Sequence, residues 1–320
     1  MRSPDKAYFL KILLLDVLLL VTSLTIVYAV DFHNVNISII AEYRFYRDTY
    51  AFLAGLILGF SGSVLQASLR NPLVDHYVLG IGSTSLFAAY LAIALLGSVD
   101  LVLIVVSSLA GGLSGLALSL SLANYLGGSE VAYVLAGVGV ASLFSGLSFI
   151  LSYYILQKQP YAWALLLGSF VTPLKEYLPY LVAASFISLI AYLQLARKLN
   201  LLLLGDIYSK QFGVDPKTTR LVANLVAGGL SSIVVGFFGT IGFLGLVAPN
   251  LVRLLFKTSD NRVTVLNSSI LSGILLLTTD LATRKVLVTK VGEIPAGGVV
   301  SAFGGVFFLL ILLREVKSIG

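Results

Sequence analysis

The stretch LVLIVVSSLAGGLSGLALSLSL, residues Leu101–Leu122, contains no charged residue and decides the fold class of this chain. A helix needs about 20 apolar residues to cross the hydrocarbon core of a bilayer, and this stretch has that length. Gly111, Gly112 and Gly115 lie inside it. Small residues allow membrane helices to approach closely, so we expect this segment to be a tightly packed transmembrane helix.

The composition of the whole chain agrees with this interpretation. Of its 320 residues, 58% are hydrophobic and only 11% are charged, and the mean hydropathy is +0.98. Soluble domains carry about a quarter charged residues, so a membrane protein is favoured. The net charge of +6 is spread between apolar runs and does not form a basic face, so we expect no nucleic-acid partner. The absence of cysteine excludes disulfides, thiolate metal sites and cysteine nucleophiles.

Apolar runs of spanning length recur along the chain. They are continuous and do not alternate in polarity, so they predict helices and not the strands of a membrane barrel. We therefore predict an all-α, polytopic membrane protein with about ten transmembrane helices and a single domain over residues 1–320. The expected spans are 10–30, 50–69, 80–97, 101–122, 131–156, 177–196, 219–238, 240–256, 263–283 and 296–314.

The distribution of basic residues predicts the orientation. With the N-terminus inside, about two thirds of the 21 Lys and Arg residues fall in inner segments, as the positive-inside rule requires. We therefore expect a multi-pass protein of the cell membrane with both termini in the cytoplasm. The first apolar run is too long for the core of a signal peptide, so we interpret it as a retained helix.

The longest inner segment predicts a short helix between two spans. In Leu201–Pro216, Asp206 is placed to cap this helix, and Gly213 stands where a left-handed stop would fall. Asp215 followed by Pro216 is typical of the cap and first residue of the next helix. Further along, Asp280 and Arg284 are four residues apart and are expected to pair on one helix face.

Several segments, in order from Arg44 to Arg314, resemble those of the FecCD family of permeases. The resemblance covers most of the chain, with Asn250 at the usual histidine of the family, Ser209 at an alanine and Thr283 at a small residue. The segments that carry it are Ser61–Leu73, Leu135–Val138, Trp163–Ser169, Leu204–Gly213, Gly239–Arg253, Asp280–Arg284 and Glu293–Gly297.

The resemblance implies the permease architecture of a type II ABC importer. Such a permease carries iron–siderophore complexes, haem or cobalamin, which an extracellular binding protein delivers. It implies a homodimer with two cytoplasmic ATPase subunits, surrounded by membrane lipid. No G-x-x-x-x-G-K-[ST] loop occurs in the sequence, so ATP is expected on a separate subunit and this chain is not expected to be an enzyme or to hold a cofactor.

The resemblance also implies roles for individual residues. The expected ATPase-coupling residues are Gly205, Asp206, Tyr208, Ser209, Phe212 and Gly213; those docking the binding protein are Arg44, Arg47 and Arg284; those of the cytoplasmic gate are Ser129, Glu130 and Val131; and those of the translocation path are Gln66 and Asn71.

Structural interpretations stand beside these roles. The outer arginines equally suit lipid headgroups or a local ion pair such as Arg47 with Asp48, and Glu130 suits a solvent-facing position. Asn71 before Pro72 is also typical of a helix stop.

Two other functions are alternatives to a permease. One is an ion-coupled carrier without an ATPase, disfavoured because most charged residues fall at span ends. The other is an intramembrane serine protease around Ser61, which would need a histidine base in a later span.

Overall fold

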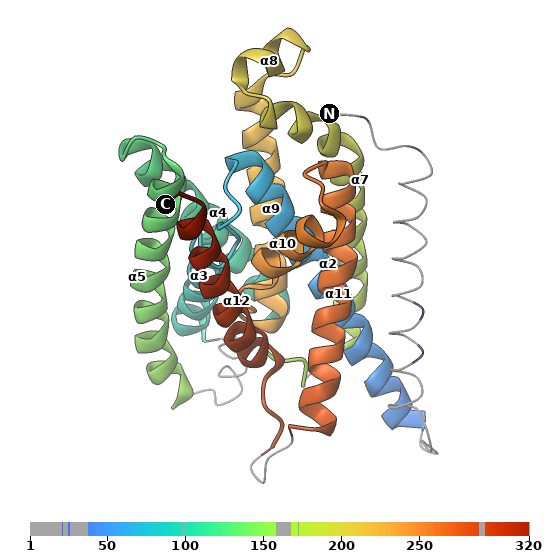
Figure 1. The fold of residues 1–320 in the computed structure, drawn as a ribbon. Coiled ribbons are helices and arrows are strands. Elements are labelled where there is room, and N and C mark those ends of the chain that lie inside the picture. Colours follow the sequence, from blue (N-terminus) through green and yellow to red (C-terminus); the bar gives the residue numbers. More distant parts are fainter. Residues whose placement is uncertain are drawn as a thin grey trace.

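The computed structural model describes residues 38–97, 99–157, 168–171, 173–287 and 292–319, together with Val21 and Thr25 (Figure 1). The regular elements of these ranges are helices, which confirms the all-α prediction. They are α2 (Ser38–Leu69), α3 (Ile81–Leu96), α4 (Leu101–Tyr125), α5 (Glu130–Leu156), the 3-10 turn η2 (Lys175–Tyr177), α7 (Leu178–Leu203), α8 (Asp206–Gln211), α9 (Pro216–Phe238), α10 (Leu244–Phe256), α11 (Asn261–Lys285) and α12 (Ala296–Ile319).

The helices follow the expected spans closely. Among the described residues, six are long and apolar enough to cross a membrane, and three shorter apolar ones are α3, α10 and the described part of α12. The expected first span, 10–30, lies outside the described residues. The largest difference is the start of α2, at Ser38 and not near residue 50. Its polar first turns are helical because Arg47 and Tyr50 are buried against other helices and have partners there.

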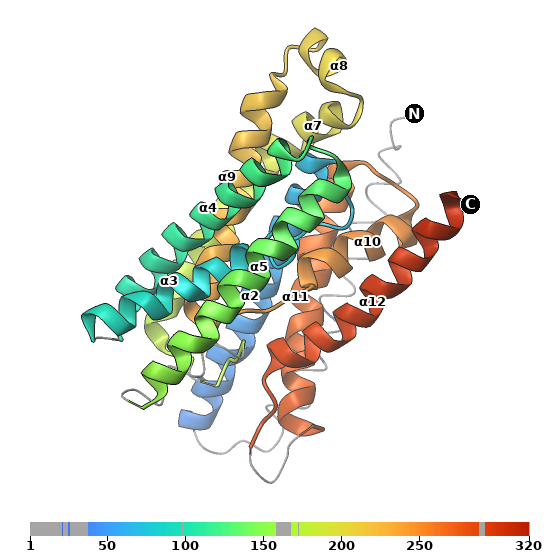
Figure 2. The same cartoon turned by 90° about the vertical axis from the view of Figure 1, so that its left-hand side faces the viewer.

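The core of the bundle lies around α2, which packs against α11, α9, α7 and α10 (Figures 1 and 2). Of the most apolar window of α2, 78% is buried, against 22% for α5, so α2 is central and α5 peripheral. Gly62 allows the closest approach to another backbone, because a Cβ atom there would lie 2.0 Å from the carbonyl oxygen of Gly245 on α10. Gly62 thus serves the close packing of α2 against α10, as small residues do between membrane helices.

Two helices begin inside the bundle after non-helical segments. Gly80, with a φ of 77°, precedes α3, and Phe243, with a φ of 63°, precedes α10. The two segments touch, because the rings of Tyr77 and Phe243 lie 5.3 Å apart and His76 contacts the carbonyl oxygen of Ile241. Non-helical backbone is tolerated at membrane depth only where protein covers it, as here. This contact explains why α10 is shorter than a full span.

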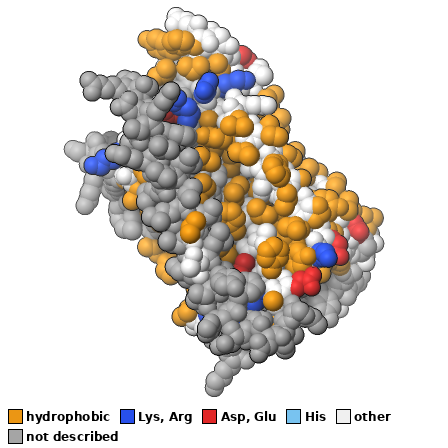
Figure 3. Space-filling model, turned by 90° about the vertical axis from the view of Figure 1, so that its right-hand side faces the viewer, with side chains coloured by type: hydrophobic (Ala, Val, Ile, Leu, Met, Phe, Trp, Pro, Cys, Tyr) orange, Lys and Arg blue, Asp and Glu red, His pale blue; other side chains and the backbone are white. Residues whose placement is uncertain are grey.

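The outward surfaces of the bundle are apolar. On the face shown in Figure 3, hydrophobic side chains cover the middle, and charged side chains gather toward the two ends. This is the distribution that a lipid bilayer requires of a spanning protein. The exposed side chains of α7 include Tyr180, Phe186, Ile187, Leu189, Ile190 and Leu193.

Candidate functional site

The helix α8 projects from one end of the bundle between α7 and α9 (Figures 1 and 2). Gly205, at a φ of 111°, turns the chain out of α7, and Gly213, at a φ of 77°, ends the segment beyond Phe212. Side chains with a Cβ atom rarely adopt such angles, so both turns depend on glycine. Asp215 then caps α9 by accepting from the backbone N–H of Thr218 at 2.9 Å. The predictions for Gly213, Asp215 and Pro216 are confirmed.

The sequence predicted that Asp206 caps α8. In the structure Asp206 forms ion pairs and does not cap the helix. It is the first helical residue, and its carboxylate accepts hydrogen bonds from Arg220 at 2.9 and 2.6 Å and from Arg70. The hydrogen bonds from Arg220, then those from Arg70, lower the pKa of Asp206 to about 2. The carboxylate therefore links α8 to α9 and to the end of α2. This pairing is long-range, so the local capping pattern could not reveal it.

Ser209 has a different place from the other residues assigned to ATPase coupling. Its side chain is fully buried, and its hydroxyl donates to the carbonyl oxygens of Leu201 and Gly205, at 2.8 Å each. It therefore fastens α8 to the last turn of α7 and offers no surface to a partner. The serine in place of the alanine of the family adds a hydrogen bond within the chain.

The tip of α8 exposes three large apolar side chains. Ile207, Tyr208 and Phe212 are 75%, 57% and 66% exposed. We call these three residues the apolar tip. A short helix that is held by ion pairs and a buried hydroxyl, yet leaves such side chains in water, has the features of a protein-docking element.

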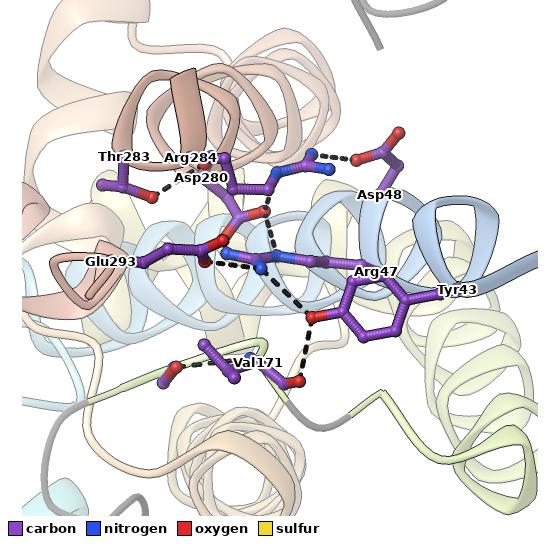
Figure 4. A network of polar contacts seen from close by, with 9 residues as sticks. Tyr43, Arg47, Asp48, Val171, Asp280, Thr283, Arg284 and Glu293 are labelled. Carbon is purple, nitrogen blue, oxygen red and sulfur yellow. Dashed lines mark hydrogen bonds and ion pairs between the residues drawn. The ribbon is translucent and has the colours of Figure 1, made fainter. Parts of the chain in front are cut away.

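The opposite end of the bundle contains a buried ionic network (Figure 4). Arg47 on α2 donates to both carboxylate oxygens of Asp280 on α11, at 2.9 and 2.8 Å, and it pairs with Glu293 at 2.7 Å. Arg47 and Asp280 are 2% and 1% exposed. The third partner of Arg47 is the hydroxyl of Tyr43, which accepts a hydrogen bond at 3.3 Å. The charge of Arg47 is therefore neutralised inside the chain, and its docking to a binding protein stays a prediction.

Arg284 belongs to the same network. It is 6% exposed and pairs with Asp48 on α2 and with Asp280, whose carboxylate lies 3.2 Å from its Nε atom. The expected pair of Asp280 and Arg284 on one helix face is therefore confirmed. The guanidinium of Arg284 is buried, and docking by this residue also stays a prediction. Arg44 is only partly buried and lies one turn before Arg47 on α2.

The residues of the expected gate lie in the turn between α4 and α5. Gly127 and Gly128 form the turn with φ values of 94° and 66°. Ser129 caps α5 by accepting from the N–H of Ala132 at 3.1 Å. Glu130 is exposed, and Val131 is 65% exposed. The surface position of Glu130 agrees with the structural alternative given for it.

The residues expected on the translocation path are enclosed by the chain. Gln66 is buried, donates to the carbonyl oxygen of Gly245 at 3.3 Å and accepts from Arg253. Asn71 is buried, donates to the carbonyl oxygen of Glu130 at 2.8 Å and accepts from the N–H of Leu73. Neither side chain faces open space, and Asn71 stabilises the end of α2 as the alternative reading proposed.

Asn250, which stands where the family usually has histidine, bridges two elements. Its side-chain amide donates to the carbonyl oxygens of Pro72 and Leu246, at 2.9 Å each. It ties α10 to the segment after α2. The serine-protease alternative finds no support at His76, because its Nε2 atom bonds to the carbonyl oxygen of Ile241 and not to Ser61.

The comparisons with known proteins agree with this geometry. The family model described as the FecCD transport family matches residues 7–314. A relative of Helicobacter pylori (strain J99), the "Probable iron chelatin transport system permease protein", is 32% identical over 88% of this chain and 86% of its own. The iron(3+)-hydroxamate import system permease protein FhuB of Bacillus subtilis is 30% identical over 88% of this chain and 73% of its own.

A solved structure extends the likeness to the fold. It is described as "An inward-facing conformation of a putative metal-chelate type ABC transporter", and it superposes with a TM-score of 0.78 at 28% identity. The alignment covers 95% of this chain and 99% of that one. The chain belongs to the FecCD transport family, and it is a multi-pass membrane permease with the fold of a type II ABC importer.

Proposed function

We propose that this permease is the membrane subunit through which an ATP-driven importer moves an iron chelate. The two curated relatives described above carry iron chelatin and iron(3+)-hydroxamate in their names, which supports a ferric siderophore as cargo. Haem and cobalamin are the next candidates. ATP is hydrolysed by a separate subunit.

The observation that carries this proposal is the apolar tip on a firmly held α8. Ser209 and the ion pairs of Asp206 connect α8 to α7, α9 and the end of α2, so a push on the tip is transmitted to three helices. A rigid element transmits such a displacement, whereas a mobile loop would absorb it. We assign Ile207, Tyr208 and Phe212 to direct contact with the ATPase, and this end of the bundle to the cytoplasm.

The opposite end would then face the extracellular binding protein. Arg44 is the docking residue in this proposal, because it lies on the outer turns of α2 and is partly exposed. Arg47 and Arg284 act indirectly, by holding α2 against α11 and the segment of Glu293.

The proposed assembly contains two copies of this chain. Gly139 and Gly146 on α5 are seven residues apart, and a Cβ atom at either would meet nothing within 4 Å. The same holds for Gly298 and Gly305 on α12. Outward glycines at this spacing suit close packing against another helix, so α5 and α12 are the proposed contact with the second copy.

The turn of Ser129, Glu130 and Val131 would then form the cytoplasmic gate near the two-fold axis. Gln66 and Asn71 would act on the translocation path indirectly. Gln66 holds α2 against α10, and Asn71 holds the end of α2 against the start of α5.

The experiment is reconstitution of the permease with its cognate ATPase and binding protein in proteoliposomes. Uptake of ferric hydroxamate, haem or cobalamin is measured with and without ATP. Phe212→Ala is expected to weaken ATPase binding about tenfold, because removal of a buried interface aromatic commonly costs more than 1 kcal/mol. Phe45→Ala, at the outer end, is the matched control and is expected to leave ATPase binding unchanged. ATP-independent uptake driven by an ion gradient would contradict the proposal.

A further inference from the structure

Two ionisable side chains are buried side by side where the two helix breaks meet. Asp75 and His76 lie in the segment between α2 and α3 and are 0% and 1% exposed. The structural contacts described above give them no part in docking or coupling. Buried ionisable groups are costly unless they are paired, so the state of this pair needs an explanation.

The hydrogen bonds define which atoms carry protons. Nε2 of His76 lies 3.0 Å from the carbonyl oxygen of Ile241. A carbonyl oxygen only accepts, so this nitrogen must carry the hydrogen. Asp75 uses Oδ1 to accept from the backbone N–H groups of Tyr77 and Val78, at 2.9 and 2.7 Å. Two such bonds favour the ionised carboxylate over the acid.

The remaining polar atom of each side chain lies near that of the other. Nδ1 of His76 and Oδ2 of Asp75 are 4.0 Å apart, and neither has a hydrogen-bond partner among the described residues. With a neutral imidazole and an ionised carboxylate, both atoms would be acceptors. Two buried acceptors pointing at each other lose their hydration and gain no bond, which is unfavourable. One additional proton between them removes this conflict.

We propose that Asp75 and His76 form a buried proton-binding site, in which Nδ1 of His76 takes up one proton and directs it at Oδ2 of Asp75. The proton comes from water, and no covalent bond between heavy atoms forms or breaks. The protonated pair is neutral overall, as an imidazolium beside a carboxylate. Its other hydrogen bond, from Nε2 to Ile241, is then made by a charged donor and is strengthened.

The surroundings leave Asp75 as the group that acts on the imidazole. From the segment between α9 and α10 the ring meets the backbone of Ile241, and from α3 it lies near Gly82. The nearby titratable side chain, Tyr77, turns its ring toward Phe243. Burial of the ring disfavours the protonated imidazole, and among the described residues the charge of Asp75 favours it.

The site lies at a joint between two parts of the bundle. Asp75 and His76 belong to the break before α3, and Ile241 belongs to the break before α10. Uptake of the proton therefore strengthens the contact between these two breaks, and its release weakens it. Near neutral pH the folded chain holds a proton that the unfolded chain mostly lacks, so the free energy of unfolding falls as the pH rises.

Nitrogen-15 NMR of histidine-labelled full-length permease in lipid nanodiscs tests the proposal. The sequence contains only two histidines, so His33→Gln leaves the His76 signals alone. At about pH 7.5, where an ordinary histidine is mostly neutral, both ring nitrogens of His76 are expected to be protonated. Raising the pH should remove the proton from Nδ1.

Asp75→Asn is the matched variant. Its amide oxygen still accepts from Tyr77 and Val78, and its NH₂ group donates to a neutral Nδ1 without any added proton. His76 in this variant is expected to be singly protonated at Nε2 at about pH 7.5. An unprotonated Nδ1 in the parent chain at about pH 6, or the same titration in Asp75→Asn, would overturn the proposal.

A second variant keeps the test decisive if Asp75→Asn fails to fold. His76→Gln retains a side-chain donor for the carbonyl oxygen of Ile241 but has no titratable nitrogen. The melting temperature of the parent chain should fall relative to that of His76→Gln between about pH 6 and pH 9. Parallel melting curves across this range would show that no proton is bound, and would likewise overturn the proposal.

Discussion

The two ends of this permease use their charged residues in opposite ways. At the end opposite α8, Arg47 and Arg284 are almost fully buried and neutralised by Asp280, Glu293 and Asp48. At the end that carries α8, the ion pairs of Asp206 stay near the surface, where Asp206 is 48% exposed, and apolar side chains extend into water beyond them. The charges of the first end are neutralised within the chain, whereas the second end exposes apolar side chains to which a partner could bind.

The difference shows that the same residue types stabilise the two ends by different amounts. A buried ion pair is expensive to break, because the remaining charge has no solvent to receive it. An exposed pair costs little to break, because water replaces the partner. The buried network of Arg47 and Asp280 therefore acts on folding, whereas the surface pairs at α8 act on the position of the helix. The predictions below separate these two roles.

The largest expected effect is at Asp280. Asp280→Ala leaves Arg47 buried without its main carboxylate and should reduce the free energy of unfolding by about 3–5 kcal/mol. Equilibrium unfolding in mixed micelles measures this change. Adding Arg47→Met to Asp280→Ala should restore most of the loss, because the uncompensated charge is then removed. Asp100→Ala, which loses the exposed cap of α4, is the control with an expected cost of about 1 kcal/mol. If Asp280→Ala and Asp100→Ala lose the same free energy of unfolding, the buried network does not stabilise the fold more than an exposed cap.

An intermediate effect is expected at Arg44, which lies one turn before Arg47 and is only partly buried. Arg44→Glu should weaken binding of the cognate binding protein about tenfold, mainly through slower association, and the effect should shrink at high salt. Binding to permease in nanodiscs, followed at two salt concentrations, measures it. Arg197→Glu is the matched control, because Arg197 is exposed near the end of α7 that leads to α8. If both variants bind equally well, docking does not involve Arg44.

The smallest effect on stability is expected at Asp206. Asp206→Asn removes exposed ion pairs with Arg220 and Arg70 and should cost less than about 1 kcal/mol. The pKa of Asp206 is lowered to about 2, so its contribution is complete above about pH 4, the value of an unfolded aspartate, and disappears as the pH falls through 2. Unfolding measured at about pH 7 and pH 5 should therefore give the same difference. A loss above about 2 kcal/mol would place Asp206 among the buried pairs.

Much of the fold could be predicted from local patterns. The apolar runs placed the helices among the described residues to within a few positions, because a bilayer requires continuous apolar length. The start of α2 was missed because polar residues 38–49 fold into a helix through partners far along the chain. Arg47 and Asp280, for example, are 233 residues apart. No local pattern reports such a partner.

The candidate site was predicted in part. Gly213, Asp215 and the short helix that precedes them followed from capping and turn chemistry, which act over a few residues. The roles of Asp206, Ser209 and Arg47 did not follow, since each depends on what covers the side chain. The positions of Asn71 and Gln66 could not be predicted for the same reason. A polar residue in a membrane protein can line a transport path or stabilise a helix end, and the sequence does not distinguish the two.

The sequence by itself determined that this chain spans a membrane with many helices and that a short helix interrupts the spans. Both properties depend on the length and order of neighbouring residues. Only the tertiary structure decided that Arg47 and Arg284 are neutralised internally, that the apolar tip of α8 is exposed, and that His76 bonds to the backbone of Ile241. Those outcomes depend on burial and on contacts between distant segments, and burial is set by the packing of the whole bundle.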